Sequence, residues 1–448
     1  MNSTEDELTI EATNTPNWID RAAKKILFNR LRGMNRGEVT VEDGSAKETL
    51  GVKNHLSAVL HIHRCRFYRD AVCGGALSVA ESYLRGDWDC DQLTSLFRIL
   101  IRNADATARL SGGLAHLTGV FQRLYHRWHY NSKSGSRRNI AAHYDLGNDF
   151  FKLCLDESMA YSSGIFLAPN ESMKDASIEK IDRLCRKLDL RPQDHLLEIG
   201  SGWGGLAIHA AHNYGCRVTT TTISHEQFRL TRNRIDQHNL SDKVTVIEQD
   251  YRDVTGTFDK LVSVEMIEAV GYAYFDAYFK KCASLLKPSG TMAIQAIVLP
   301  ERDYETYLRN TDFIQRYIFP GGCLPSLGAM LESVGRVTDL RFVHAEDFAP
   351  HYAETLRQWR RVFHEQLPEI RRQGFPERFL RMWHYYFCYC EAVFEERAAG
   401  VIQVQFDKPD CRRDPLLLST WAAETSHMAA RFKRQSNSFA VPIEQEQS

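Results

Sequence analysis

The sequence has no long hydrophobic run. No stretch approaches the roughly 18 uninterrupted apolar residues that a transmembrane helix requires. The first seven residues are acidic and polar, the opposite of the start of a signal peptide. Residues 1–15 and 433–448 are polar, and we expect both ends to be disordered. These absences predict a cytoplasmic protein. To reach a lipid substrate, such a protein would associate peripherally with the inner face of the membrane.

The sequence also lacks ordered cysteine spacing and a net charge of either sign. Its 11 cysteines follow neither a metal-ligand nor a disulfide pattern, and Cys388 and Cys390 are too close for a Cys-x-x-Cys pair. His61 and His63 have no third ligand at a matching spacing, so we predict no metal site. The net charge of −1 gives no overall attraction to nucleic acid, which we exclude as a partner. A homodimer is left open.

The length of 448 residues indicates two or three folded units. Residues 16–122 mix short strand signals, at 39–41 and 56–63, with a helical pattern at 93–101. Residues 123–138 form a basic, aromatic connector, which fits a solvated linker or a contact with anionic headgroups. Residues 139–432 form the larger unit. There strands are predicted at 194–199, 217–223, 244–248, 260–264 and 291–297, with helices between them. This alternation predicts an α/β fold, a doubly wound, Rossmann-like parallel sheet.

A glycine-rich turn follows the first of these strands. Gly200, Gly202 and Gly205 satisfy G-x-G-x-x-G, which fits a dinucleotide or S-adenosylmethionine. The dinucleotide pattern requires an acidic residue about 20 positions later, but residues 219–224 contain none. Glu198 before the turn and Asp250 after the third strand would instead point into the ligand crevice. Carboxylates there suit the cationic S-adenosylmethionine better than a pyrophosphate, so we predict that cofactor.

Several longer motifs resemble the cyclopropane-fatty-acyl-phospholipid synthase family. They comprise residues 139–151, 159–162, 265–271 and 313–326 in the larger unit. In the smaller unit, Glu81, Ser82, Tyr83, Gly86, Trp88, Cys90, Asp91 and Leu93 resemble the N-terminal domain of the bacterial phospholipid enzymes. The resemblance covers residues 50–407 and implies a class I methyltransferase fold with an N-terminal accessory domain. It also implies methylene transfer from S-adenosylmethionine to the cis double bond of a phospholipid acyl chain.

The resemblance further implies the site residues. Those that would hold S-adenosylmethionine are Tyr161, Ser162, Gly200, Ser201, Gly202, Thr222, Ile223, Gln227, Tyr251 and Arg252, beside the Glu198 and Asp250 carboxylates. In this family a bound bicarbonate is thought to remove the proton, and its site maps onto the Ile297 backbone, Glu268 and Tyr352. Two positions depart from the family pattern: Ser163 stands where a cysteine is expected, and Gln295 stands where a histidine is expected. Both can still donate hydrogen bonds to an anion.

Cys390 corresponds to a cysteine of the family that has been described as part of the active site. We interpret it here as an inert, buried helical residue, because nothing near it in the sequence would favour a thiolate.

The product and two rival functions stay open. If Ser163 and Gln295 still hold bicarbonate, the product is a cyclopropane; otherwise a methyl-branched, methylene or furan-precursor chain follows. The rivals are a methyltransferase for a soluble small molecule and a lipid-binding protein with a degenerate cofactor turn. Intact Tyr161, Gln227, Glu268 and Tyr352 argue against the second rival.

Overall fold

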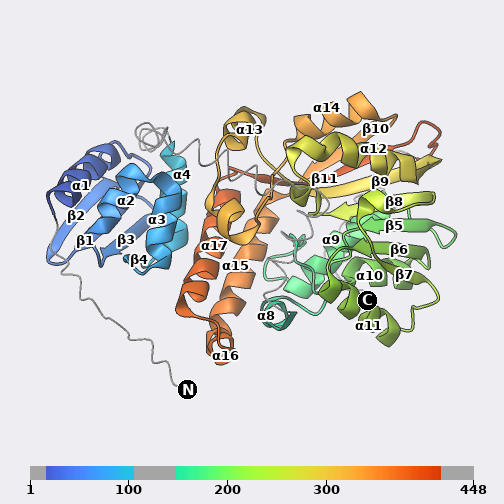
Figure 1. Ribbon diagram of the computed structural model, residues 1–448, viewed down its shortest axis with the longest axis horizontal. Coiled ribbons are helices and arrows are strands. Elements are labelled where there is room, and N and C mark those ends of the chain that lie inside the picture. The colour runs from blue at the N-terminus through green and yellow to red at the C-terminus, as the bar shows by residue number, and fades with distance from the viewer. Residues whose placement is uncertain (1–16, 105–147, 415–448) are drawn as a thin grey trace, which may run out of the picture.

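The computed structural model describes residues 17–104 and 148–414 (Figure 1). The predicted disordered ends, 1–15 and 433–448, and the basic connector at 123–138 lie outside these residues. Within the described residues, no helix is both long and apolar enough to cross a bilayer.

The N-terminal unit is a small α+β domain, shown in blue in Figure 1. Its sheet has the order β2-β1-β3-β4, in which β1 and β3 are parallel and the other pairs antiparallel. The strands are β1 (Gly37–Asp43), β2 (Ala46–Val52), β3 (Ser57–Ile62) and β4 (Trp88–Cys90), and the helices are α1 (Trp18–Leu31), α2 (Arg66–Cys73), α3 (Gly75–Leu84) and α4 (Leu93–Arg102). Asn17 and Asp20 form a capping box that starts α1. The predicted strands at 39–41 and 56–63 and the helix at 93–101 are confirmed.

The larger unit is built on a seven-stranded sheet with the order β10-β11-β9-β8-β5-β6-β7. Its strands are β5 (His195–Ile199), β6 (Arg217–Thr222), β7 (Val244–Glu248), β8 (Phe258–Val264), β9 (Leu286–Val298), β10 (Arg341–Asp347) and β11 (Gly400–Asp407). All five predicted strands are present. Successive residues of β5 face opposite sides of the sheet. Leu196 packs under α9 (Met173–Lys187), α10 (Gly205–Asn213) and α11 (His225–Gln237), and Leu197 packs under α12 (Phe275–Leu285) and α14 (Leu327–Val337). Because both faces are covered by helices, the predicted doubly wound architecture is confirmed.

The helices of this unit range from 6 to 19 residues in length. They are α8 (Asn148–Cys154), α9 (Met173–Lys187), α10 (Gly205–Asn213), α11 (His225–Gln237), α12 (Phe275–Leu285), α13 (Glu301–Leu308), α14 (Leu327–Val337), α15 (Ala349–Glu365), α16 (Leu367–Arg372) and α17 (Glu377–Glu395). Short 3-10 segments occur at η1 (Tyr251–Asp253), η2 (Ile267–Ala269) and η3 (Tyr272–Tyr274), and a π-helical turn at η4 (Ile314–Ile318).

The sheet is not wholly parallel, which corrects one part of the sequence interpretation. Strands β5 to β9 are parallel, but β11 is antiparallel to both β9 and β10. The segment 400–407 alternates apolar residues with Gln403 and Gln405, which is typical of a strand with one solvated face. Both glutamines are nevertheless fully buried. The Gln403 amide donates to Gln295 Oε1 (3.0 Å), and the Gln405 amide donates to the Lys187 carbonyl (2.7 Å). Because these partners are distant in the sequence, the local pattern did not reveal that the strand is buried.

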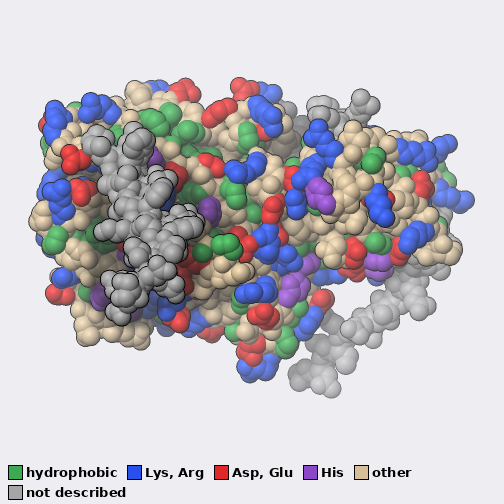
Figure 2. Space-filling model, turned by 180° about the vertical axis from the view of Figure 1, so that it is seen from behind, with side chains coloured by type: hydrophobic (Ala, Val, Ile, Leu, Met, Phe, Trp, Pro, Cys, Tyr) green, Lys and Arg blue, Asp and Glu red, His purple; other side chains and the backbone are tan. Residues whose placement is uncertain are grey.

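The two units pack against each other through α17, which lies between them with α15 in Figure 1. Aromatic rings join them, as Phe97 of α4 meets Tyr385 of α17 edge to face at 4.9 Å. At the end of α17, Glu396 accepts from Arg98 Nε (2.6 Å) and Arg102 Nε (2.7 Å). One hydrophobic cluster runs through both units. On the outer face shown in Figure 2, acidic and basic side chains of the described residues are interspersed.

Candidate active site

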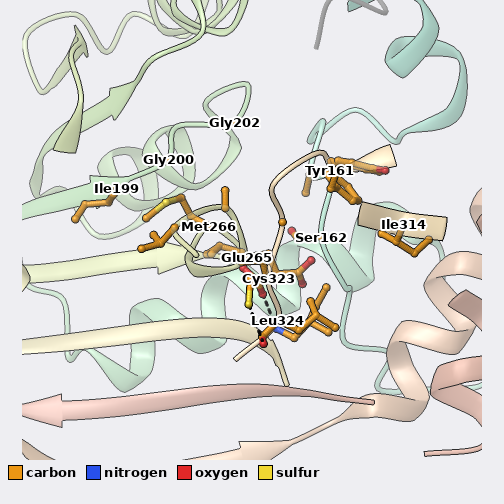
Figure 3. A pocket seen from close by; sticks show the side chains of 18 of the residues that line it. Tyr161, Ser162, Ile199, Gly200, Gly202, Glu265, Met266, Ile314, Cys323 and Leu324 are labelled. Carbon is orange, nitrogen blue, oxygen red and sulfur yellow. Dashed lines mark hydrogen bonds between the residues drawn. The ribbon is translucent and has the colours of Figure 1, made fainter. Parts of the chain in front are cut away.

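A cavity of about 460 Å³ lies at the carboxyl ends of the parallel strands. Its walls come from the glycine turn after β5, the ends of β6 and β7, the loop after β8 and the end of β9. Helices α15 and α17 and the π-turn η4 close the other side. Figure 3 shows Gly200 and Gly202 on one side of this space, with Tyr161 and Ile314 facing them. Ligands of doubly wound folds bind at this end of the sheet.

The glycine turn has the backbone geometry of a ligand cradle. Gly200 has φ +94° and Gly202 has φ +48°, both in the left-handed region that favours glycine. A Cβ on Gly200 would lie 3.2 Å from Met266 Cγ, whereas one on Gly202 would meet no atom within 4 Å. The turn is fixed from behind, because the N–H groups of Gly200 and Ser201 both donate to the Thr221 carbonyl. The open side of Gly202 therefore gives a ligand close access to the backbone.

Glu198, the carboxylate just before this turn, is buried and incompletely paired. Its Oε2 has no hydrogen-bond partner among the described residues. Burial raises the pKa of the Glu198 carboxyl to about 8, and nearby Thr220 and Lys180 offset only part of this rise. A cationic ligand at the turn would stabilise the charged form. The group therefore fits the amino-acid end of S-adenosylmethionine.

The ends of β6 and β7 bring together the other predicted cofactor residues. Thr222 Oγ1 donates to Gln227 Oε1 (2.8 Å), and both residues line the cavity beside Ile223. Asp250 is held by Arg252, whose Nε donates to its Oδ1 at 2.8 Å. Tyr251, between them in the sequence, also lines the cavity. The crevice position expected for Asp250 is thus observed, although its charge is neutralised by Arg252.

The segment before α9 supplies the far wall. The Tyr161 hydroxyl donates to the Tyr386 hydroxyl (3.0 Å), and its ring lies 5.2 Å from that of Trp359. Ser162 Oγ accepts from Lys180 Nζ (2.7 Å), a lysine of α9 that is only 2% exposed. Burial lowers the pKa of this ammonium, and the carboxylates of Glu265 and Glu198 oppose that effect. The sequence did not single out Lys180, because on α9 it looks like any other helix lysine.

Two carboxylates follow β8 on the same wall. Glu268 Oε1 accepts from the Ile297 N–H (2.6 Å), while its Oε2 is buried without a partner among the described residues. Burial and the neighbouring Glu265 raise the pKa of Glu268 to about 8. Glu265 itself was noted in the sequence only as part of a family motif. In the structure it lies at the centre of a network with Ser163, Gln295 and Tyr352.

Of the remaining predicted residues, Cys390 lines the cavity, whereas Ser163 and Gln295 do not. Ser163 and Gln295 are fully buried behind the cavity wall. The Ser163 hydroxyl donates to the Gly164 carbonyl (3.0 Å), so it is turned away from the cavity. Cys390 of α17 lies on the wall, and burial raises the pKa of its thiol, which favours the neutral form. This agrees with the interpretation of Cys390 as a small apolar residue.

The donors predicted to hold bicarbonate are therefore already engaged. The Ser163 N–H, the Gln295 amide and the Tyr352 hydroxyl all donate to Glu265, and the Ile297 N–H donates to Glu268. An added anion would also face these two carboxylates. The residues present do not fit a bicarbonate ion.

Comparison with known proteins identifies the family. The family model described as "Mycolic acid cyclopropane synthetase" matches residues 131–404, more than half of the chain. The chain belongs to this family. It is 40% identical to the tuberculostearic acid methyltransferase of Mycobacterium tuberculosis over 73% of this chain and 78% of that protein. It is 34% identical to the cyclopropane-fatty-acyl-phospholipid synthase of Escherichia coli over 89% of this chain and 96% of that protein.

Solved structures of the cyclopropane synthase family agree with this assignment. The mycolic acid cyclopropane synthase CmaA1, crystallised with SAH and CTAB, superposes with a TM-score of 0.58 at 28% identity. The match covers 61% of this chain and 98% of that one. The chain is accordingly an S-adenosylmethionine-dependent methyltransferase of the cyclopropane synthase type, with the class I fold expected from the sequence.

Proposed function

We propose that this enzyme transfers a one-carbon unit from S-adenosylmethionine to the cis double bond of a phospholipid acyl chain, giving a cyclopropane. The observation that carries the proposal is the composition of the cavity. A glycine cradle and the incompletely paired Glu198 lie at one end, and aromatic rings and two further carboxyl groups lie at the other. The Escherichia coli relative, named for this reaction, matches along 89% of the chain.

In this proposal the predicted cofactor residues hold the methyl donor. Gly200, Ser201 and Gly202 approach it with their backbone, and Glu198 carries the charge opposite its ammonium group. Thr222, Gln227 and Tyr251 border the nucleoside side of the same space. Bound S-adenosylmethionine supplies an electrophilic methyl group on a sulfonium. The chain's contribution is to hold the double bond in line with that methyl group.

The aromatic wall suits the charge that develops on the acyl chain. Attack by an alkene leaves a carbocation, which water would quench, so the site must be dry. The rings of Tyr161 and Phe319 and the hydroxyl of Tyr386 face the cavity beside the Glu265 and Glu268 carboxyl groups. Aromatic faces and carboxylates both stabilise a nearby positive charge.

Expression in a bacterium that lacks such an enzyme tests the proposal. Fatty acid methyl esters from the phospholipids should gain the mass of one methylene group per modified chain, and Gly200→Val should abolish the gain. A folded wild-type protein that leaves the lipids unchanged, but methylates a soluble compound in an extract, would instead support the small-molecule alternative.

A methyl-branched or methylene chain is the alternative product of the same site. Of the two departures from the family pattern, Ser163 contacts Glu265 through its backbone N–H and Gln295 through its side-chain amide. The relative at 40% identity is named for tuberculostearic acid. Hydrogenation followed by gas chromatography and mass spectrometry separates the two products, because a methylene group is saturated under conditions that leave the ring intact.

We also propose that the substrate is reached at the inner face of the membrane by peripheral contact. The support is the lipid substrate class of the relatives together with the finding that the described helices include no membrane span. Sedimentation with vesicles of anionic phospholipid should carry the enzyme into the pellet. An enzyme that stays in the supernatant at low salt would contradict this proposal.

A further inference from the structure

Glu265 is the meeting point of the groups expected to bind an anion. Its Oε1 accepts from the Ser163 N–H (2.9 Å) and from Gln295 Nε2 (2.8 Å). Its Oε2 accepts from the Tyr352 hydroxyl (2.8 Å). These donors come from the segment before α9, from β9 and from α15, so three distant parts of the chain converge on one carboxylate. The same residue lines the cavity, in which Figure 3 shows it near Met266 and Ser162.

The backbone at Glu265 is strained. Its φ is +46°, in the left-handed region that glycine adopts freely and that other residues rarely enter. Such a conformation is unfavourable and persists where the surrounding structure imposes it, commonly at active sites. The Glu265 N–H is fixed by the Gln295 carbonyl (2.8 Å). A glycine would adopt this backbone conformation without strain. The presence of a glutamate therefore indicates that its side chain has a function at this position.

Of the two neighbouring carboxyl groups, Glu265 has the better-stabilised charged form. Its charged form receives three hydrogen bonds and the attraction of the buried Lys180 ammonium. Glu268 is stabilised by backbone hydrogen bonds, from Ile297 and from its own N–H, and is subject to the repulsion of Glu265. Two close carboxyl groups do not readily ionise together, so the proton remains on the less stabilised member of the pair. Burial raises the pKa of both groups, and within the pair these contacts favour the charge on Glu265 and the proton on Glu268.

We infer that the carboxylate of Glu265 is a built-in replacement for bicarbonate and accepts the proton that the reaction releases. The inference rests on the proposed function. The π electrons of the double bond form a carbon–carbon bond to the methyl group, and the sulfur–methyl bond breaks with its electrons left on sulfur. A C–H bond of the new methyl group then breaks. Its electrons close the ring, or form a double bond after a hydride shift, and its proton passes to a Glu265 oxygen. Either product requires this one proton transfer, after which Glu265 returns the proton to solvent.

The first test uses the wild-type enzyme with and without bicarbonate. Activity on vesicles of an unsaturated phospholipid is measured in buffer freed of carbon dioxide and again with added bicarbonate. A resident base predicts the same rate in both. A rate that collapses without bicarbonate and returns on its addition would overturn the inference, whatever the variants do.

The second test removes the proposed base. Glu265→Gln keeps the shape but cannot accept a proton, and the turnover number should fall by about 100- to 10,000-fold. S-adenosylmethionine affinity, measured by calorimetry, should stay near that of wild type. Retention of more than about a tenth of the wild-type rate would exclude Glu265 as the base, since general-base catalysis contributes more than that.

The third test distinguishes a base from a structural group. Glu265→Gly relieves the backbone and opens space beside the same donors, so formate or bicarbonate should raise its rate at least about tenfold. A folded Glu265→Gly protein that neither anion restores would limit Glu265 to a structural role. If even the wild-type enzyme modifies no lipid, the proposed function fails instead, so the two failures are distinguishable.

Discussion

Two buried carboxyl groups at opposite ends of the cavity, those of Glu198 and Glu265, are satisfied in opposite ways. At the glycine turn, Glu198 keeps a buried oxygen that no described residue pairs, and no described side chain covers the cavity side of Gly202. At the other end, Glu265 receives three hydrogen bonds from within the chain. A buried carboxylate without hydrogen-bond partners destabilises the fold unless a ligand supplies them. A carboxylate with all its partners inside the chain is already fixed in position and needs no ligand. The first end is therefore built to receive a cationic ligand, and the second end carries its own anion.

The largest effect is expected at the first end, from Gly200→Val. A β-branched residue at φ +94°, with its Cβ 3.2 Å from Met266 Cγ, must displace the turn. A strain of about 3 kcal/mol corresponds to a loss of S-adenosylmethionine affinity of roughly 100-fold. Calorimetry measures this loss. Gly335→Val is the matched control, because a Cβ at Gly335 of α14 meets nothing within 4 Å. Equal affinity in both variants would show that the turn does not bind the cofactor.

These two ends also differ in how well the sequence predicted them. Glu198 lies in β5, and Gly200 and Gly202 follow directly after it, so their spacing in the sequence was enough to place them at the end of that strand. Glu265 acts through Ser163, Gln295 and Tyr352, which are up to 102 positions away in the chain. No periodicity encodes such a convergence, and the motif around 265–268 drew attention to Glu268 instead. The antiparallel β11 was missed for a related reason, since its glutamines are buried by distant partners.

The next effect is expected at the second end, from Gln295→Leu. This amide donates to Glu265 (2.8 Å) and accepts from Gln403 (3.0 Å), so its loss removes one hydrogen bond from each of two buried polar groups. We expect the free energy of unfolding to fall by about 2 to 4 kcal/mol and the turnover number to fall about tenfold. Chemical denaturation and initial rates measure the two effects.

Gln405→Leu is the control that separates these effects. Gln405 is equally buried on β11, but it bonds to the Lys187 carbonyl and does not line the cavity. It should lose stability while the turnover number is kept. If Gln405→Leu reduced turnover as much as Gln295→Leu, the contact with Glu265 would have no catalytic importance.

A smaller effect, on the pH dependence, is expected from Tyr352→Phe. Burial raises the pKa of Glu265, and the Tyr352 hydroxyl opposes this by bonding to the charged form. Because the base must be ionised, activity is lost as the pH falls through this pKa. Removing the hydroxyl raises the pKa further, so the acid limb of the rate profile should move to higher pH by about one unit. Tyr385→Phe, in the core beside Phe97, should leave the limb in place. A limb that moves to lower pH in Tyr352→Phe would contradict the role of Glu265.

The smallest effect is expected outside the cavity, from Glu396→Gln where the two units meet. Arg98 and Arg102 both bind this carboxylate, and they lower its pKa. The ionised form therefore stabilises the folded protein above the unfolded-state pKa of about 4.3, and this contribution is lost as the pH falls through the lower folded-state value. We expect a loss of about 1 to 2 kcal/mol at neutral pH, from denaturation, with little change in turnover. Glu305→Gln removes an exposed partner of Arg309 and should change stability by less than about 0.5 kcal/mol. If the difference in the free energy of unfolding between wild type and Glu396→Gln stayed the same at a pH well below the folded-state pKa, the charge of Glu396 would not contribute to the contact between the units.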